Sequence, residues 1–256
     1  MNNNLLSTDE FIKRKKRKKT IKKTLLLFVF LVSIFVILCL KLPYFNISKI
    51  SVEGNNNISK ENILDLSKFE KGTNIFYTNT NIAKENILSN AYIESVTIKK
   101  TLPDKIKIFV KEREALFYNM VGKKYYIISK NSCLLEKRDN IKNMNLIKVD
   151  GFNVDKSKIG KKLNCDDERK LGVLTEIGEL LINNNSNVKF TYLDLKNILD
   201  IKIYANNVLV KIGVSDNIKD KLNKAINILK RKELQKSQKA YIDVSFDGNP
   251  VFRVEK

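Results

Sequence analysis

Serine and lysine are the residue types that could form a catalytic pair in this sequence, because the chain contains no histidine. Without histidine, Ser-His-Asp and Cys-His catalysis are excluded. A Ser-Lys hydrolase stays chemically open, and such an enzyme needs one lysine that loses its charge through burial. The 48 Lys and Arg residues include no lysine that the sequence singles out for this role.

The residue composition supports a metal or cofactor site even less than it supports a catalytic pair. Three cysteines and no histidine cannot supply the ligands of a four-coordinate structural zinc site. The chain also has no Gly-rich phosphate-binding motif. We therefore expect no catalytic residues, no metal ligands and no cofactor, although scattered carboxylates leave a glycan-cleaving site open. Cys133 and Cys165 could form one disulfide, but neither belongs to a C-x-x-C pair, and two free thiols are the simpler expectation.

A basic segment followed by an apolar run organises the N-terminal part of the chain. Nine Lys or Arg residues stand in Lys13–Lys23, and Thr24–Leu40 is free of charge, with 14 of its 17 residues Leu, Ile, Val or Phe. Basic segments stay on the cytoplasmic side of a membrane, and such an apolar run crosses it. We predict a basic cytoplasmic tail over residues 1–23, disordered up to Ile12, then a transmembrane helix over residues 24–42.

The apolar run has two other interpretations, a cleaved signal sequence and a buried core helix. Seventeen residues at about 1.5 Å each extend only ~26 Å, but Lys23 and Lys41 can snorkel and lengthen the apolar span. A cleaved signal sequence would end in a small-x-small site, which residues 39–44 lack. A buried core helix would not explain the flanking lysines. An uncleaved single-pass anchor is therefore favoured, with the C-terminal domains extracytoplasmic, and nucleic acid is excluded as a partner.

The charge of the exported part allows a second class of function. The net charge is +20, and residues 1–23 contain nine basic and two acidic residues, so residues 24–256 have a net charge of +13. A cationic exported domain could bind an anionic wall polymer or lipid. The lysine-rich clusters that would bind it are Lys123-Lys124, Lys161-Lys162 and Lys230-Arg231-Lys232. A compositional bias toward Lys, Asn and Ile is the plainer explanation.

Residues 46–113 predict a small α+β domain. A strand over residues 47–52 ends in a turn, and Ser59 and Thr80 are the expected N-caps of two short helices. Residues 93–98 and 106–110 alternate as two strands of a hairpin with one buried face. The predicted order is β-α-α-β-β, a three-stranded sheet covered by two helices.

Residues 115–256 predict a second, β-rich unit with two helices. The helices are expected at Asp166–Ile182 and Ser215–Arg231, the latter capped by Ser215 or Asp216. A closing strand is expected over Tyr241–Phe246, followed by a turn and a short strand over 251–253. The other expected strands cover 116–121, 125–128, 133–135, 146–149, 188–195, 201–204 and 208–212.

Three motifs in the first unit resemble a known family. They are Ile50-x-Val52-x-Gly54, Gly72-x-Asn74-Ile75-Phe76, and the hairpin from Val96-x-Ile98 through Pro103 to Glu112-Arg113. In this order after a single anchor, they are similar to the POTRA domain of FtsQ/DivIB bacterial cell-division proteins. The resemblance implies a POTRA domain over residues 46–114 and a β domain over 115–256, in which the segment YIDVSF matches the family's closing strand.

The resemblance also implies a function. Such proteins are non-catalytic scaffolds of the division septum that dock two small single-span coiled-coil proteins, FtsB- or DivIC-like and FtsL-like. They help to recruit or regulate the septal wall synthases. In the family, the partner docks on the C-terminal part of the β domain, and an open sheet edge can accept a partner strand. We expect the partner-binding edge to consist of Tyr241, Val244, Phe246 and Phe252, although these residues could equally close the core.

Overall fold

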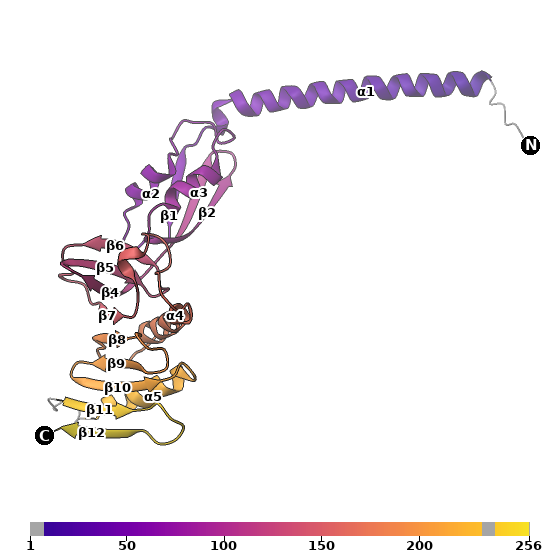
Figure 1. Cartoon of the computed structure of the whole chain (residues 1–256). Helices are drawn as coiled ribbons and strands as arrows, with labels where there is room; N and C mark the ends of the chain where they lie inside the picture. Colours follow the sequence, from indigo (N-terminus) through magenta and orange to yellow (C-terminus); the bar gives the residue numbers. More distant parts are fainter. Residues whose placement is uncertain (1–7, 232–238, 256) are drawn as a thin grey trace, which may run out of the picture. The chain divides into compact units, whose positions relative to one another are not determined.

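The computed structural model describes residues 8–231 and 239–255 (Figure 1). The chain divides into two compact units. The first contains residues 1–53, 60–84 and 97–109, and the second contains residues 54–59, 85–96 and 110–256. Helices and both parallel and antiparallel strands are present, so the α+β prediction is confirmed.

Helix α1, Thr8–Lys41, is 34 residues long. Its segment Ile12–Lys41 is long and apolar enough to cross a membrane, and no part of its most apolar window is buried in the protein. The hydroxyl groups of Thr24 and Ser33 donate to carbonyls one turn earlier, at 3.0 and 2.8 Å, so these polar groups are satisfied within the helix. The expected disorder up to Ile12 is wrong from Thr8 onward, because these residues form the first turn of a helix that continues through Lys13–Lys23, and Lys and Arg are good helix formers. Residues 1–7 lie outside the described part of the chain.

The small sheet has the strand order β1-β3-β2. Strand β1 lies parallel to β3, with Lys49 opposite Lys105. Strand β3 alternates between exposed and buried residues along its first half, as the hairpin prediction requires. The elements of this part are the short helix η1 Pro43–Phe45, β1 Lys49–Glu53, α2 Lys60–Ser67, α3 Thr80–Leu88, β2 Ile93–Thr101 and β3 Lys105–Glu112.

Two predicted helix caps are wrong. The side-chain oxygen of Asn79, rather than that of Thr80, accepts the free N–H groups of α3, from Asn81 at 3.0 Å and Ile82 at 3.2 Å. Asn217 precedes helix α5, Ile218–Leu229, in a left-handed conformation without a side-chain cap. Asp216 instead forms an ion pair with Lys221. Neighbouring polar residues compete for each cap, and the pattern of apolar residues does not decide between them.

The large sheet has nine strands in the order β12-β11-β10-β9-β8-β7-β4-β5-β6. It is mixed, since β4/β7, β7/β8 and β10/β11 are parallel pairs. The strands are β4 Ala115–Val121, β5 Lys124–Ser129, β6 Leu134–Arg138, β7 Ile147–Asp150, β8 Tyr192–Asp194, β9 Ile201–Ala205, β10 Val208–Gly213, β11 Lys239–Asp243 and β12 Val251–Glu255. A short helix η2, Val154–Lys156, follows β7.

Helix α4, Arg169–Ile182, and helix α5 bury their apolar stripes in the core of this sheet. Leu174 and Ile177 of α4 and Leu222 and Ala225 of α5 join one continuous cluster of buried side chains. The same cluster contains the alternate residues of strands β7 to β11. The opposite residues of those strands therefore lie on the face of the sheet that this cluster does not occupy.

Candidate functional site

The candidate site is the end of the large sheet formed by β11 and β12. Strand β12 is the last in the strand order, and β11 lies between β10 and β12 (Figure 1). Ile242 of β11 stands opposite Phe252 of β12, and Tyr241 stands opposite Arg253. Of the four expected site residues, Phe252 lies on the edge strand and Tyr241 lies one strand further in.

Strand β11 is shorter than predicted. The Asp243 carboxylate accepts hydrogen bonds from the Ser245 backbone N–H at 2.9 Å and from its hydroxyl at 2.6 Å. This local turn competes with the ladder and ends the strand at Asp243. The predicted strand through Phe246 is therefore three residues too long, and Val244 and Phe246 follow the strand.

Exposure separates the expected residues. Val244 is only 2% exposed and belongs to the core, so its side chain is closed to a partner. Phe246 is 43% exposed, and Phe252 is 36% exposed. Two further apolar residues of the edge strand, Val251 and Val254, are exposed as well. We call Phe246, Val251, Phe252 and Val254 the β12 edge.

The sequence interpretation missed Val251 and Val254 as members of this edge. It placed the last strand at 251–253, whereas β12 continues to Glu255. The run Val251-Phe252-Arg253-Val254 is rich in β-branched and aromatic residues, which is the signal that could have extended the strand.

The backbone of β12 has a free side within the described chain. Its inner side pairs with β11 from Val251 to Glu255. Among the strands that the structure describes, none lies on its outer side. At the opposite end of the sheet, Leu134 of β6 has its N–H bonded to the Lys161 carbonyl at 2.9 Å, and its carbonyl accepts the Gly160 N–H at 2.7 Å. The first residue of β6 is thus paired with the loop at residues 160–161, whereas β12 has no described strand on its outer side.

Basic residues flank the β12 edge. The Arg231 guanidinium lies 5.3 Å from the centre of the Phe252 ring, within cation–π range. The Lys224 ammonium donates to the Gly248 carbonyl in the β11–β12 turn at 3.2 Å. These contacts give the edge a positive rim beside an apolar strip.

Tyr241 and Asp243 form a polar pair on the face of β11 that points away from Ile242. The Tyr241 hydroxyl donates to Asp243 Oδ2 at 2.7 Å. Burial first, and then this hydrogen bond, raises the pKa of Tyr241 to about 12. Burial raises the pKa of Asp243, but hydrogen bonds from Ser245 and Tyr241 outweigh it and leave that pKa below its usual value. At neutral pH the phenol is neutral, and the carboxylate fixes its ring.

Tyr241 also belongs to a row of side chains that crosses the large sheet. Residues directly opposite one another on paired strands lie on the same face. The row consists of Tyr118, Lys148, Tyr192, Tyr204, Leu209, Tyr241 and Arg253, each paired with the next. All except the exposed Arg253 are half-buried.

Contacts between neighbours hold part of this row. The rings of Tyr192 and Tyr204 are 5.3 Å apart, and the Lys148 ammonium lies 5.3 Å from the Tyr192 ring. Sequence reasoning did not find the row, because each tyrosine was visible only as the polar-side residue of its own strand. The pairing of strands distant in sequence brings these residues into line.

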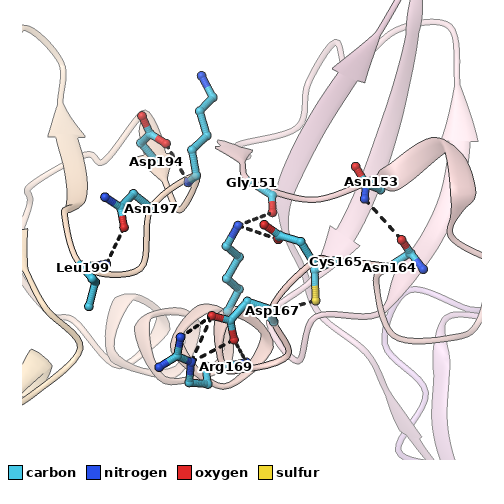
Figure 2. Close-up of polar contacts among 12 residues, drawn as sticks. Gly151, Asn153, Asn164, Cys165, Asp167, Arg169, Asp194, Asn197 and Leu199 are labelled. Carbon is cyan, nitrogen blue, oxygen red and sulfur yellow. Dashed lines mark hydrogen bonds and ion pairs between the residues drawn. The ribbon is translucent and has the colours of Figure 1, made fainter.

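The segment before α4 holds a second polar cluster (Figure 2). Asp167 accepts the Arg169 guanidinium at 2.7 Å and the Arg169 backbone N–H at 3.0 Å, and its carbonyl accepts the Cys165 thiol at 3.3 Å. The hydrogen bond from Arg169 lowers the pKa of Asp167. These contacts start α4 at Arg169, three residues later than predicted, so the cluster has a structural role.

A Ser-Lys hydrolase would need a buried lysine. Lys170 and Lys221 are buried, with 5% and 6% of their side chains exposed. The Lys170 ammonium donates to Asp166 at 2.7 Å and to the Gly151 carbonyl at 3.5 Å. Lys221 donates to the Val214 carbonyl at 3.2 Å and also pairs with Asp216. Carboxylate and carbonyl oxygens therefore occupy both amines, and none of these hydrogen-bond partners is a serine hydroxyl.

Cysteines and acidic clusters offer no other chemistry in the described part of the chain. Cys133 and Cys165 are free thiols rather than a disulfide. Burial raises the pKa of both thiols, which makes them poor nucleophiles. Within the residues that the structure describes, no group of three or more Cys, Asp or Glu side chains could hold a metal ion.

Comparison with known proteins identifies the class. Residues 45–113 match the family described as "POTRA domain, FtsQ-type". The chain is 60% identical to the cell division protein DivIB of Clostridium botulinum over the full length of both chains. It is 47% identical to DivIB of Clostridium acetobutylicum over 88% of this chain and 89% of that protein. It is 28% identical to the cell division protein FtsQ of Syntrophotalea carbinolica over 57% of this chain and 55% of that protein.

An apolar N-terminal helix consistent with a single-pass anchor and an FtsQ-type POTRA domain define a class of bacterial cell-division proteins. The chain belongs to the FtsQ/DivIB family. This family places it in the division machinery of the cell, the divisome.

Proposed function

We propose that this protein is a non-catalytic scaffold of the division septum, anchored in the cell membrane by α1. The nine basic residues of Lys13–Lys23 orient the helix with its N-terminus in the cytoplasm, by the positive-inside bias. The two folded units are then extracytoplasmic. In this position the protein docks other division proteins and helps to recruit or regulate the septal wall synthases.

We propose further that the partners are small single-span coiled-coil proteins of the FtsB/DivIC and FtsL types, and that one of them adds a strand to β12. The observation that carries this proposal is the open side of β12, which pairs with no described strand. Backbone hydrogen bonds to that side would supply affinity, and the exposed Phe252 and Val254 side chains would supply apolar contacts. Phe246, beyond the end of β11, would extend the same contact.

The positive rim sets the chemistry of the partner segment. Arg231 and Lys224 flank the β12 edge, and Arg253 is exposed on it. An extended segment with acidic residues beside apolar ones would match this charge pattern. Charge complementarity of this kind raises the rate of association and fixes the register.

The test is capture of a coiled-coil partner by the full-length protein in mild detergent. Phe252→Asp and Phe246→Asp should each weaken capture about tenfold or more, the usual effect of losing an apolar anchor. Tyr241→Asp should act similarly, because it removes the aromatic ring beside the edge. Leu199→Asp is the matched control, since Leu199 is 65% exposed and lies in the turn before β9. Unchanged capture by the first two variants, with normal circular dichroism, would falsify the site.

A cationic domain that binds anionic wall polymer or lipid is the second candidate. The net charge of +13 beyond residue 23 and the exposed Lys161 and Lys162 favour it. Binding of this kind falls steeply with salt, because salt screens exposed charges beyond about 8–10 Å. Strand addition should be much less salt-sensitive, because backbone hydrogen bonds and apolar contacts supply most of its affinity. Capture that persists at high salt supports docking. A serine acylated by a hydrolase-directed probe would instead support the enzyme alternative.

A further inference from the structure

The loop that follows α2 is attached to the end of helix α1. The Asn74 side-chain amide donates to the Cys39 carbonyl at 3.0 Å and to the Leu40 carbonyl at 3.2 Å. Asn74 is only 7% exposed. The last carbonyls of a helix have no partners inside the helix, so a buried amide that satisfies two of them fixes this loop to the helix end.

Backbone hydrogen bonds fix the same loop to the segment that leaves the helix. The Ile75 N–H donates to the Phe45 carbonyl at 2.9 Å, and the Ile47 N–H donates to the Thr73 carbonyl at 2.9 Å. The Asn74 side-chain oxygen accepts the Phe76 N–H at 2.9 Å. Residues 72–77 therefore have a fixed position next to the last turn of α1.

Aromatic and apolar side chains are exposed at this junction. Leu42 is 43% exposed, Tyr44 67%, Phe76 41% and Tyr77 62%. The rings of Phe45 and Phe76 are 5.3 Å apart, and those of Tyr44 and Phe45 are 5.2 Å apart. We call Leu42, Tyr44, Phe76 and Tyr77 the aromatic collar. Soluble domains rarely expose apolar and aromatic side chains together in this way. Such a patch usually marks a contact with a partner or a membrane.

We propose that the aromatic collar lies in the interfacial layer of the lipid bilayer and holds the first folded unit against the membrane surface. This inference rests on the proposed anchoring by α1. Tyrosine rings next to a membrane helix favour the headgroup region, where the ring contacts apolar chains and the hydroxyl stays in water. Phe76 and Leu42 add apolar area to the same contact. The collar begins one residue after Lys41, the last residue of α1, so it continues the contact between the helix and lipid.

Asn74 acts as a positioning residue in this arrangement. Its amide joins the loop that carries Phe76 and Tyr77 to the helix whose end sets the depth in the bilayer. Asn74→Asp keeps the acceptor for the Phe76 N–H and loses the donor to the two carbonyls. It also places a negative charge at the negative end of a helix, which is unfavourable.

Tryptophan fluorescence in vesicles tests the proposal. The chain contains no tryptophan, so one introduced residue reports alone. The full-length protein with Tyr77→Trp is reconstituted in phosphatidylcholine vesicles whose acyl chains carry bromine near the headgroup or near the bilayer centre. Shallow bromines should reduce its emission about twofold and deep ones much less, as expected for a residue at the interface.

Three matched variants make the result decisive. Phe30→Trp, in the apolar run of α1, should be quenched by deep bromines; if it is not, the anchoring itself is wrong. Phe109→Trp, a partly exposed position on β3 of the same unit, should be unquenched. Adding Asn74→Asp to Tyr77→Trp should cut the quenching at least by half. If Phe30→Trp is quenched while Tyr77→Trp is not, or if Phe109→Trp is quenched as strongly, the collar proposal is overturned.

Discussion

The two ends of the large sheet differ in what lies on the outer side of their last strands, β6 and β12. At β6, both backbone groups of Leu134 are bonded to residues 160–161, and the Leu134 side chain is only 1% exposed. At β12, none of the described strands lies on the outer side, and the apolar Val251 is 56% exposed. The chain itself pairs with the start of β6, whereas the outer side of β12 has no described strand beside it.

The two strand edges differ in how readily they could pair with another chain. Unpaired strand edges invite pairing with other chains, so proteins usually cover them, shorten them or charge them. The loop at residues 160–161 pairs with the first residue of β6. The β12 edge has basic residues around it, such as Arg231, and they would disfavour pairing with a second copy of this cationic chain while admitting an acidic segment. In the docking proposal, this contrast distinguishes β6, a structural edge, from β12, the proposed interaction edge.

Removing a buried side chain from the β6 end should give the largest effect. Leu134→Ala should lower the free energy of unfolding by about 2–4 kcal/mol, because it opens a cavity in a packed core. Urea denaturation followed by circular dichroism measures it. A loss below about 1 kcal/mol would show that the packing of Leu134 at the β6 end adds little to the free energy of unfolding.

Changing the loop at residues 160–161 should have an intermediate effect. Gly160 has a φ of +79°, and its N–H bonds to the Leu134 carbonyl. Gly160→Ala should cost about 1–2 kcal/mol, because an L side chain strains a left-handed backbone. Hydrogen exchange of the β6 amides should speed up with it. Gly72→Ala, at a φ of +86° with nothing near its missing Cβ, is the control that strains a loop and leaves β6 protected.

The acid sensitivity of the open end can be read from Asp243. Its pKa is lower in the folded protein than in the unfolded chain, so its contribution to stability is present above the unfolded pKa and is lost as the pH falls through the folded pKa. Asp243→Asn should cost about 0.5–1 kcal/mol at neutral pH, discounted for partial exposure. It should also flatten the loss of stability in acid, measured by denaturation between pH 7 and pH 2. An unchanged acid profile would assign that loss to other carboxylates.

Shortening one exposed side chain of the β12 edge should have the smallest effect on stability. Val254 is 38% exposed, so Val254→Ala should change the free energy of unfolding by less than about 0.5 kcal/mol. The same variant should still weaken partner capture severalfold if β12 is the docking strand. Paired denaturation and capture measurements give both numbers. A large loss of stability with unchanged capture would make β12 a structural strand like β6.

Much of the fold could be predicted because local patterns decide it. The apolar run of α1 and the alternation of Ile106, Ile108 and Val110 mark their elements through periodicity. The predicted ends failed where side chains compete with the backbone, as at Asp243, which ends β11, and Asn79, which caps α3. These choices depend on single hydrogen bonds that the apolar pattern does not contain.

The candidate site was only partly visible in the sequence. Phe246 and Phe252 could be chosen because exposed aromatics near a closing strand are plausible anchors, and both are exposed. Val244 looked equivalent in sequence but is buried, because it follows Ala240 and Ile242 in alternation on the core face, and its N–H still bonds to the Lys211 carbonyl of β10. The row from Tyr118 to Arg253 was invisible, because strand order in a mixed sheet does not follow chain order.

The sequence alone determined that an apolar segment is followed by two α+β units and that histidine-based catalysis is absent, because composition and periodicity act residue by residue. Tertiary structure decided which strand lies at the open end and which loop pairs with the start of β6. It also brought Asn74 to the end of α1 and aligned tyrosines from distant strands. Pairing across long stretches of chain depends on the whole core packing at once, and no local pattern records it.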